Sequence, residues 1–270
     1  MNVEISLEKD LSLIRKNKPL ILHLVNYVAM NDCANVTLAL HASPIMTSYE
    51  DEIKEIVSKS DSLYINIGTP TRRIIDVIKQ ACKVANENKK PIILDPVGVG
   101  ATKARTSFVH YLLKNYEIDV LKGNYGEICS VAGLNNAMKG VDSLEINEKI
   151  VLRSCKEIAR EYSICVVATG EKDFVVDKNE NAYVVLNGHE MLSMLTGSGC
   201  MLGSVIACFL TTQKPLNACL EGLVVFNVSA EIAAKHANGL GSFKVRLLDE
   251  ISNVDTEQIK KLARIKVCQF

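Results

Sequence analysis

The 270-residue sequence predicts an α/β domain in which a mostly parallel β-sheet carries helices on both faces. Short runs rich in β-branched residues alternate with longer amphipathic stretches over the first two thirds of the chain, which is typical of parallel strands with covering helices. Hydrophobic residues make up 48% of the chain, and at this length roughly three quarters of the unfolded chain's surface can be buried. With six prolines and no Ser/Gly-rich linker, residues 1–270 are expected to form a single domain.

The expected strands are short apolar runs that end at glycine, proline or polar residues. The last three follow one another with only short turns between them, so we expect them to form an antiparallel edge of the sheet. In chain order the expected strands are Leu20–Val25, Leu63–Ile67, Pro91–Leu94, Val120–Lys122, Ile164–Ala168, Phe174–Asp177 and Tyr183–Leu186.

Two kinds of helix are expected. Arg72–Glu87 and Asn147–Tyr162 place their apolar residues mostly on one helical stripe, which predicts helices that cover a sheet and face water on the other side. Gly199–Thr211 and Leu216–Ala237 are apolar nearly all round. Such helices lie in the core of a domain or against another subunit.

The charge balance and the cysteines exclude several classes of function. With 31 basic and 31 acidic residues, the chain lacks the net positive charge that attracts proteins to nucleic acids and anionic membranes. The nine cysteines form no C-x-x-C pair, and the five histidines lie far apart, so neither disulfides nor structural zinc are expected. Met191–Phe209 comes closest to a membrane span, but Thr196–Gly199 interrupts it. We therefore expect a cytoplasmic protein with no nucleic-acid or membrane partner.

The strongest single motif is Thr196–Cys200, which directly precedes an apolar helix. Gly197 and Gly199 allow a tight turn, and the free N–H groups of the helix start then create a site for an anion. The same N–H groups are expected to lower the pKa of Cys200, so that it acts as a base or nucleophile. The alternative is a glycine-rich turn before a core helix that contains a buried cysteine.

Two further motifs place polar side chains where strands end. Asp95 precedes a glycine loop, and the run Lys122–Glu127 offers a cation, an amide and a carboxylate within one turn. In open α/β sheets ligands bind at the carboxyl ends of the strands, so Asp95 and Glu127 could hold Mg²⁺. The alternatives are that Asn124 caps a helix and that Glu127 is solvated.

The remaining candidate residues also lie at strand ends or turns. Thr169 can bond a phosphate or ribose, and Gly170 beside it can take a positive φ. Asn26 and Met46 lie where a small substrate could be held, and Asn31 or Asp32 is a natural helix N-cap. No Walker motif is present, and Gly98-Val99-Gly100 lacks the third glycine of a Rossmann fingerprint.

Taken together and in order, these motifs resemble the hydroxyethylthiazole kinase family from about residue 15 to residue 240. The resemblance implies a ribokinase-like three-layer αβα fold and a transferase that phosphorylates 4-methyl-5-(2-hydroxyethyl)thiazole with ATP and Mg²⁺ for thiamine biosynthesis. It also implies a homotrimer with active sites at subunit interfaces. The residues that carry the resemblance are Asn26, Met30–Asn35, Ala42–Met46, Asp95–Thr102, Gly123, Asn124, Glu127, Thr169–Glu171, Asp173 and Thr196–Cys200.

The resemblance also assigns roles by position. His41 and Lys122 depart from the residues that are usual there, glycine and arginine respectively, and His41 would put a bulky ring near the substrate loop. A sister kinase acting on hydroxymethylpyrimidine or pyridoxal, or a non-catalytic sensor of thiazole or nucleotide, would be the alternatives. The implied roles are Cys200, Gly197 and Gly199 in catalysis; Asn26, Met46 and Gly197 on the thiazole; Lys122, Thr169 and Asn124 on ATP; and Asp95 and Glu127 on Mg²⁺.

Overall fold

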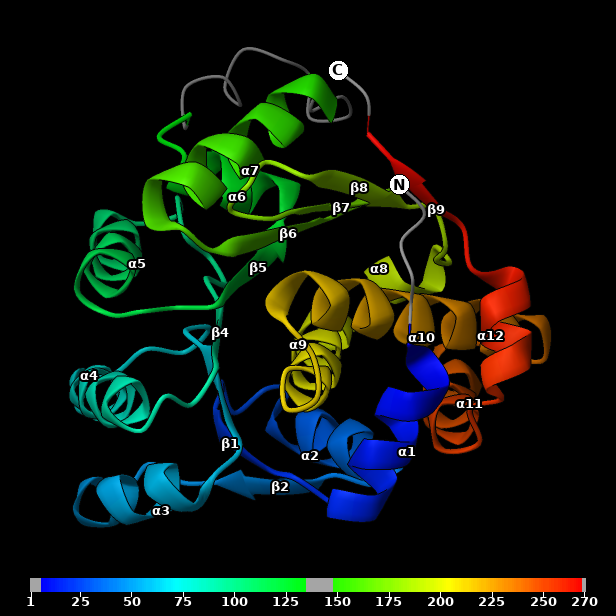
Figure 1. Cartoon of the computed structure of the whole chain (residues 1–270), viewed down its shortest axis with the longest axis horizontal. Helices are drawn as coiled ribbons and strands as arrows, with labels where there is room; N and C mark the ends of the chain where they lie inside the picture. The colour runs from blue at the N-terminus through cyan, green and yellow to red at the C-terminus, as the bar shows by residue number, and fades with distance from the viewer. Residues whose placement is uncertain (1–5, 135–147, 269–270) are drawn as a thin grey trace.

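The computed structural model describes residues 6–134 and 148–268. Within these ranges one β-sheet runs through the molecule with helices on both sides (Figure 1). Its strands are β1 (Leu20–Leu24), β2 (Ser43–Met46), β3 (Ser62–Asn66), β4 (Ile92–Asp95), β5 (Val120–Asn124), β6 (Cys165–Thr169), β7 (Asp173–Val176), β8 (Ala182–Val185) and β9 (Ile265–Val267).

The strands lie in the order β2-β1-β3-β4-β5-β6-β7-β8-β9. Strands β2 to β6 are parallel, whereas β7, β8 and β9 each pair antiparallel with the preceding strand. The expected antiparallel edge is thus confirmed. The sequence did not predict β2 and β9, which form the two edges of the sheet. β2 contains Pro44, which has no N–H to donate and is tolerated in an edge strand.

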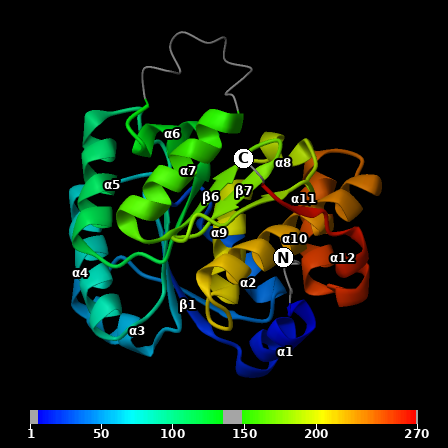
Figure 2. The same ribbon diagram turned by 45° about the horizontal axis from the view of Figure 1, so that its top comes forward.

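Helices α3 to α7 cover one face of the sheet, and the other helices cover the opposite face (Figure 2). On the first face lie α3 (Ile53–Lys59), α4 (Arg72–Glu87), α5 (Lys103–Asn115), α6 (Tyr125–Val131) and α7 (Glu148–Tyr162), preceded by the 3₁₀ turn η1 (Glu50–Glu52). On the second lie α1 (Leu7–Asn17), α2 (Met30–Ala39), α8 (Met191–Met194), α9 (Ser198–Phe209), α10 (Pro215–Lys235), α11 (Leu240–Ser252) and α12 (Thr256–Leu262).

The helix starts follow their local chemistry, with one correction. Thr71 and Thr102 cap α4 and α5 through their side-chain oxygens, and α4 has the bounds that its apolar stripe predicts. The second predicted covering helix, residues 147–162, corresponds to α7; its predicted first residue, 147, lies outside the described residues. The prediction that Asn31 or Asp32 caps a helix is wrong: α2 begins at Met30, with Ala29 at its N-cap position.

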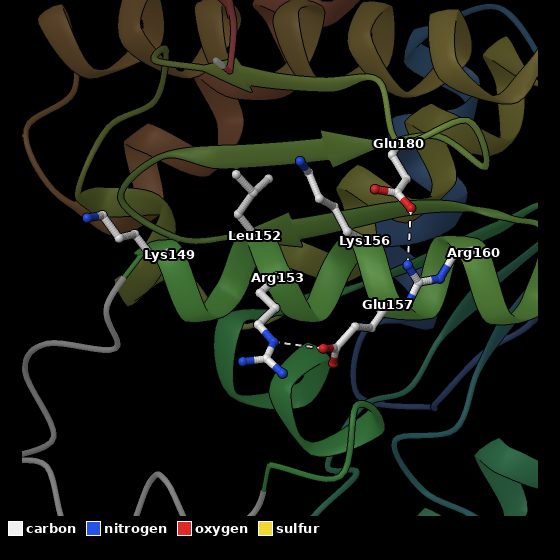
Figure 3. Close-up of a pocket in the computed structure, with 7 residues that line it drawn as sticks. All are labelled: Lys149, Leu152, Arg153, Lys156, Glu157, Arg160 and Glu180. Atoms are coloured by element: carbon white, nitrogen blue, oxygen red, sulfur yellow. Dashed lines mark hydrogen bonds and ion pairs between the residues drawn. The ribbon is translucent and has the colours of Figure 1, made fainter. Parts of the chain in front are cut away.

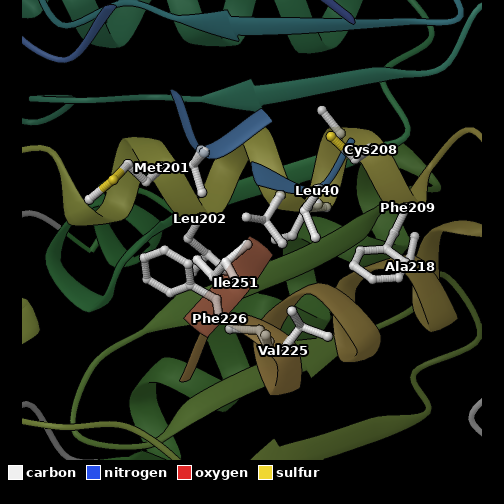
Figure 4. Packing of buried hydrophobic residues seen from close by; sticks show 14 of the residues in the cluster. Leu40, Met201, Leu202, Cys208, Phe209, Ala218, Val225, Phe226 and Ile251 are labelled. Carbon is white, nitrogen blue, oxygen red and sulfur yellow. The ribbon is translucent and has the colours of Figure 1, made fainter. Parts of the chain in front are cut away.

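Helices α9 and α10 form the centre of the core, as their uniformly apolar sequences predict. Leu202 of α9 lies beside Phe226 of α10 and Ile251 of α11 (Figure 4). The expectation that Met191–Phe209 most resembles a membrane span is wrong, because α10 is the described helix with the length and hydropathy to cross a membrane. That apolar window is 78% buried inside the protein, which identifies α10 as a core helix.

Candidate active site

The carboxyl ends of β1, β3, β4 and β5 meet the first turn of α9, and the polar side chains gathered there form one buried network. Asn26 follows β1, Asn66 ends β3, Asp95 ends β4 and Lys122 lies in β5, while Cys200 lies in the first turn of α9. All five are buried. The topology therefore brings residues from distant parts of the sequence to the edge where α/β folds bind ligands.

The Cys200 thiol accepts hydrogen bonds from two amide groups. Asn66 Nδ2 lies 3.2 Å and Asn26 Nδ2 lies 3.5 Å from Sγ. The expected lowering of the Cys200 pKa is wrong: burial and then the charge of Asp95 raise it, and Lys122 and the two amides only partly offset this. At neutral pH Cys200 is a thiol held in a fixed place.

The two asparagines are themselves oriented by the backbone. Asn66 Oδ1 accepts from Asn26 Nδ2 at 2.8 Å and from the N–H of Gly68 at 3.0 Å, and Asn26 Oδ1 accepts from the N–H of Ala29 at 3.1 Å. Each amide oxygen therefore faces a backbone N–H, and the Nδ2 groups are left to point at Cys200.

Sequence reasoning missed Asn66 and its neighbour Tyr64. The Tyr64 hydroxyl donates to Asp95 Oδ2 at 3.2 Å and accepts from Asn66 Nδ2 at 3.3 Å. Side chains two apart in a strand share one face, so the alternating polar residues Ser62, Tyr64 and Asn66 in a buried strand were a usable signal.

Lys122 and Asp95 form a buried ion pair. Lys122 Nζ lies 2.9 Å from Asp95 Oδ2 and also donates to the carbonyl of Gly199 at 2.8 Å. Burial is the largest influence and by itself lowers the pKa of Lys122, but the charge of Asp95, the hydrogen bond to it and the charges of other nearby groups together outweigh burial, so the pKa lies above the ordinary lysine value. The lysine is charged, and its charge is largely balanced before any ligand arrives.

Glu127 is fixed by backbone N–H groups. Its Oε1 accepts from the N–H of Gly98 at 2.9 Å, and its Oε2 accepts from the N–H of Asn124, also at 2.9 Å. Asn124 caps α6 by accepting from the N–H of Glu127, so the helix-cap interpretation of Asn124 describes its place here. Burial, followed by the charge of Asp95, raises the pKa of Glu127 above its ordinary value. Glu127 is half-buried and both of its oxygens accept from backbone N–H groups, so it is not simply a solvated side chain.

The carboxylates fit a magnesium ion that is shared with phosphates. Asp95 Oδ1 is buried and has no hydrogen-bond partner, so one hard oxygen ligand is available there. Within the described ranges no group of three or more His, Cys, Asp or Glu residues could hold a metal. The unpartnered Asp95 Oδ1 is the kind of ligand that Mg²⁺ takes, since this ion is usually bound by one or two carboxylates together with water and substrate phosphates.

The α9 start has the turn that the glycines predict. Gly197 has φ +86° at the N-cap position, and a Cβ there would lie 3.3 Å from the Ala29 Cβ. The Met201 N–H donates to the carbonyl of Gly197 at 2.8 Å. The N–H groups of Gly199 and Cys200 lie nearer the helix end, where backbone donors are available to an anion.

Thr169 and Gly170 lie at the neighbouring strand end. The Thr169 hydroxyl donates to the carbonyl of Gly123 at 3.3 Å. Gly170 has no positive φ, contrary to expectation; a Cβ there would lie 2.4 Å from the Tyr125 ring, so close packing requires the glycine. The N–H of Gly170 donates to Asp173 Oδ1 at 3.0 Å, and burial raises the pKa of Asp173 to about 6.

Met46 and His41 lie at opposite ends of β2. Met46 ends the strand at the ligand-binding edge, where it packs against the core. His41 precedes the strand, at the end away from Met46. Its φ of +63° lies in the left-handed region, which glycine occupies at no steric cost.

A groove along α7 lies elsewhere on the molecule (Figure 3). Arg153 pairs with Glu157 at 2.7 Å, and Arg160 pairs with Glu180 at 3.5 Å. These exposed pairs neutralise much of the local charge, and none of the predicted site residues lines the groove.

Comparisons with known proteins agree with this geometry. The sequence matches the Hydroxyethylthiazole kinase family (HK) over residues 11–257. It is 47% identical to a hydroxyethylthiazole kinase of Archaeoglobus fulgidus over 94% of this chain and 93% of that protein. The structure of a hydroxyethylthiazole kinase protein from Pyrococcus horikoshii OT3 matches with a TM-score of 0.89 and 36% identity, covering 97% of this chain and 99% of the other.

A more distant match shows the fold alone. A ribokinase-like superfamily protein from Enterococcus faecalis V583 matches with a TM-score of 0.64 at 13% identity over 88% of each chain. The ribokinase-like fold is thereby confirmed. By sequence over nearly its whole length, and by structure, the chain belongs to the hydroxyethylthiazole kinase family.

Proposed function

We propose that this chain transfers the terminal phosphoryl group of ATP to the hydroxyl of 4-methyl-5-(2-hydroxyethyl)thiazole, a step of thiamine biosynthesis. The observation that carries the proposal is the placement of the Cys200 thiol, held by two asparagine amides beside the buried Asp95–Lys122 pair. Phosphoryl transfer requires in-line positioning and balancing of negative charge more than covalent chemistry, and this site offers both.

On the acceptor side, the substrate hydroxyl would lie near Cys200. Asn26, Met46 and the backbone of Gly197 would contact the thiazole ring. The alcohol oxygen attacks the terminal phosphorus of ATP, the bond from that phosphorus to the ADP oxygen breaks so that ADP leaves, and the hydroxyl proton passes to water. Because Cys200 is a neutral thiol with a raised pKa, its role would be to orient that hydroxyl.

On the donor side, Lys122, Thr169 and Asn124 would contact ATP. Lys122 carries the charge that suits a phosphate, and the N–H groups at the α9 start add neutral donors. Asp95 and Glu127 would hold Mg²⁺, Asp95 through its unpartnered Oδ1. When bound, the ion would screen the phosphate charge.

The proposed assembly is a homotrimer with active sites at subunit interfaces. Apolar side chains next to the site face outward: Tyr27 is 74% exposed, Met194 is 55% exposed and Val245 is 60% exposed. Tyr27 lies shortly before α2, Met194 ends α8 and Val245 lies in α11, and α11 packs against both α2 and α8. Exposed apolar groups of this kind mark protein contacts. The free cysteines of the described residues support a cytoplasmic location, which is also proposed.

Release of ADP by the purified chain tests the function. With Mg²⁺ and ATP, ADP should appear on addition of hydroxyethylthiazole and not with hydroxymethylpyrimidine or pyridoxal. Equal turnover of the pyrimidine would indicate the sister-kinase alternative, and thiazole binding without ADP release would indicate a sensor. Light scattering should give three times the 29.7 kDa chain mass, and a monomer that turns over would contradict the trimer.

A further inference from the structure

Arg105 bridges the two loops that follow β3 and β4, and neither the motifs nor the family resemblance assigns it a role. It lies in the first turn of α5 and is half-buried. Its Nη1 donates to the carbonyls of Ile67 at 3.0 Å and Val97 at 2.7 Å, and its Nη2 donates to the carbonyl of Gly68 at 2.8 Å. One guanidinium therefore holds three carbonyl groups from two separate loops.

The bonded carbonyls belong to peptide groups whose N–H groups orient the site. The carbonyl of Ile67 and the N–H of Gly68 share one rigid peptide plane, and that N–H fixes Asn66 Oδ1. The carbonyl of Val97 and the N–H of Gly98 likewise share a plane, and that N–H fixes Glu127 Oε1. Turning either plane would turn an N–H away from its side chain.

From these contacts we propose that Arg105 is a positioning residue that sets Asn66 and Glu127 relative to one another through two peptide planes. Asn66 holds the Cys200 thiol, and Glu127 stands beside Asp95, so Arg105 couples the acceptor side to the carboxylate side. The planar fork of a guanidinium can hold both loops at once, whereas a lysine ammonium presents its donors from a single point. Polarisation along each hydrogen-bonded chain adds to the effect.

The geometry at Gly98 supports a specific contact between this loop and the Arg105 guanidinium. Gly98 has φ +76°, and a Cβ there would lie 2.9 Å from Arg105 Nη1. The loop therefore takes a conformation that favours glycine and leaves no room for a side chain beside the guanidinium. The carbonyls of Ile67, Val97 and Gly68 are the partners of the guanidinium in the described residues.

The kinetic test compares Arg105→Ala and Arg105→Lys with the matched control Arg153→Ala, which removes the exposed partner of Glu157. This part rests on the proposed function. Arg105→Ala should lower kcat about 10- to 100-fold, change the KM for ATP less than about threefold and raise the Mg²⁺ concentration needed for half-maximal rate. Millimolar guanidinium ion should restore part of its kcat and should not raise that of Arg153→Ala. Full activity of Arg105→Ala or of Arg105→Lys would overturn the proposal.

Amide hydrogen exchange separates this inference from the proposed function. In Arg105→Ala the amides of Gly68 and Gly98 should exchange at least about tenfold faster, while amides in β6 keep the wild-type rate. Unchanged exchange at both glycines would overturn the role of Arg105, whether or not the wild-type protein phosphorylates the thiazole. A wild-type protein without turnover, but with the faster exchange in Arg105→Ala, would overturn the proposed function and leave Arg105 as the residue that sets these loops.

Discussion

The ammonium of Lys122 lies 2.9 Å from the carboxylate of Asp95, and the two side chains are 4% and 2% exposed. A buried pair of this kind is costly to break because the remaining charge has no water around it. Lys122 can bind a phosphate only if its ammonium contacts that phosphate and Asp95 Oδ2 at the same time. The other oxygen of the carboxylate, Asp95 Oδ1, remains available. The pair links the place proposed for the metal to the place proposed for the phosphates.

Replacing Asp95 by asparagine is expected to destabilise the protein by about 3–5 kcal/mol, because Lys122 is left buried and unpaired. Urea unfolding measures this. The double variant Asp95→Asn with Lys122→Met should recover much of the loss. As a control, Glu257→Gln removes one partner of the exposed Lys260 and should change stability by less than about 1 kcal/mol. Equal stability of Asp95→Asn and wild type would contradict the buried-pair argument.

Replacing Cys200 by alanine is expected to lower kcat about 10²-fold with little change in ATP binding, because the variant loses the group that orients the acceptor hydroxyl. Steady-state kinetics and calorimetry with ATP measure the two effects. Cys268→Ser, at a half-buried cysteine far from the site in sequence, serves as the control and should keep wild-type kinetics. Unchanged turnover in Cys200→Ala would remove the thiol from the mechanism.

Replacing Glu127 by glutamine should raise the half-saturating Mg²⁺ concentration about tenfold while the fold persists, because glutamine can still serve at this capping position. Initial rates over a magnesium titration give the value. Glu171→Gln, an exposed change beside the Thr169 turn, should leave the titration as in wild type. Identical titrations for Glu127→Gln and wild type would argue against a metal at this carboxylate.

The buried Glu221 predicts a pH dependence of stability unrelated to catalysis. Burial, and then the charge of Asp10, raises the pKa of Glu221 to about 8 from an ordinary 4.5. The folded state thus binds the proton more tightly, so this contribution is full below about pH 4.5 and is lost as the pH rises through about 8.

Urea unfolding between pH 5 and 9 should therefore show a loss of stability in the wild-type protein that Glu221→Gln lacks. The N–H of Ser6 donates to Glu221 Oε1 at 2.9 Å, a bond that a glutamine oxygen can keep. A parallel fall in both proteins would assign the pH dependence to other groups.

Replacing His41 by glycine should stabilise the protein by about 0.5 kcal/mol. The strain of a left-handed histidine, about 1–2 kcal/mol, exceeds the extra entropy that glycine gains in the unfolded chain. The exposed ring has little packing to lose. Chemical unfolding of the variant gives the difference, with Lys83→Gly, at an exposed interior position of α4, as a control that should destabilise. A destabilised His41→Gly would show that the ring makes a contact worth more than the strain.

Much of the sheet could be predicted, because its central strands contain short runs rich in apolar and β-branched residues with turn residues after them. β2 and β9 escaped prediction for a physical reason: the pairing of an edge strand is determined by what lies next to it in space, and β9 has only three residues. Pro44 made β2 resemble a loop.

The site divides in the same way. Cys200, Asp95 and Glu127 could be found because glycines and strand ends mark them in the sequence. Arg105 could not be found, because its partners are backbone carbonyl groups, which every residue has and which therefore leave no pattern in the sequence. The direction of the Cys200 pKa was missed because the helix start predicts a lowering, while the depth of burial and the nearness of Asp95 are known only from the fold.

The position of α9 has a consequence for the growing chain. The helix packs against β1, β3 and β4. The last of these strands ends at Asp95, whereas α9 ends at Phe209, so the ribosome makes the helix long after the strands. During synthesis, α9 therefore cannot cover its part of this apolar face until more than a hundred further residues have been added to the chain. At about 5–20 residues per second this exposure lasts several seconds, long enough for the unfinished sheet to meet other chains. The same helix that brings Cys200 to the site thus makes nascent chains of this protein candidates for chaperone protection.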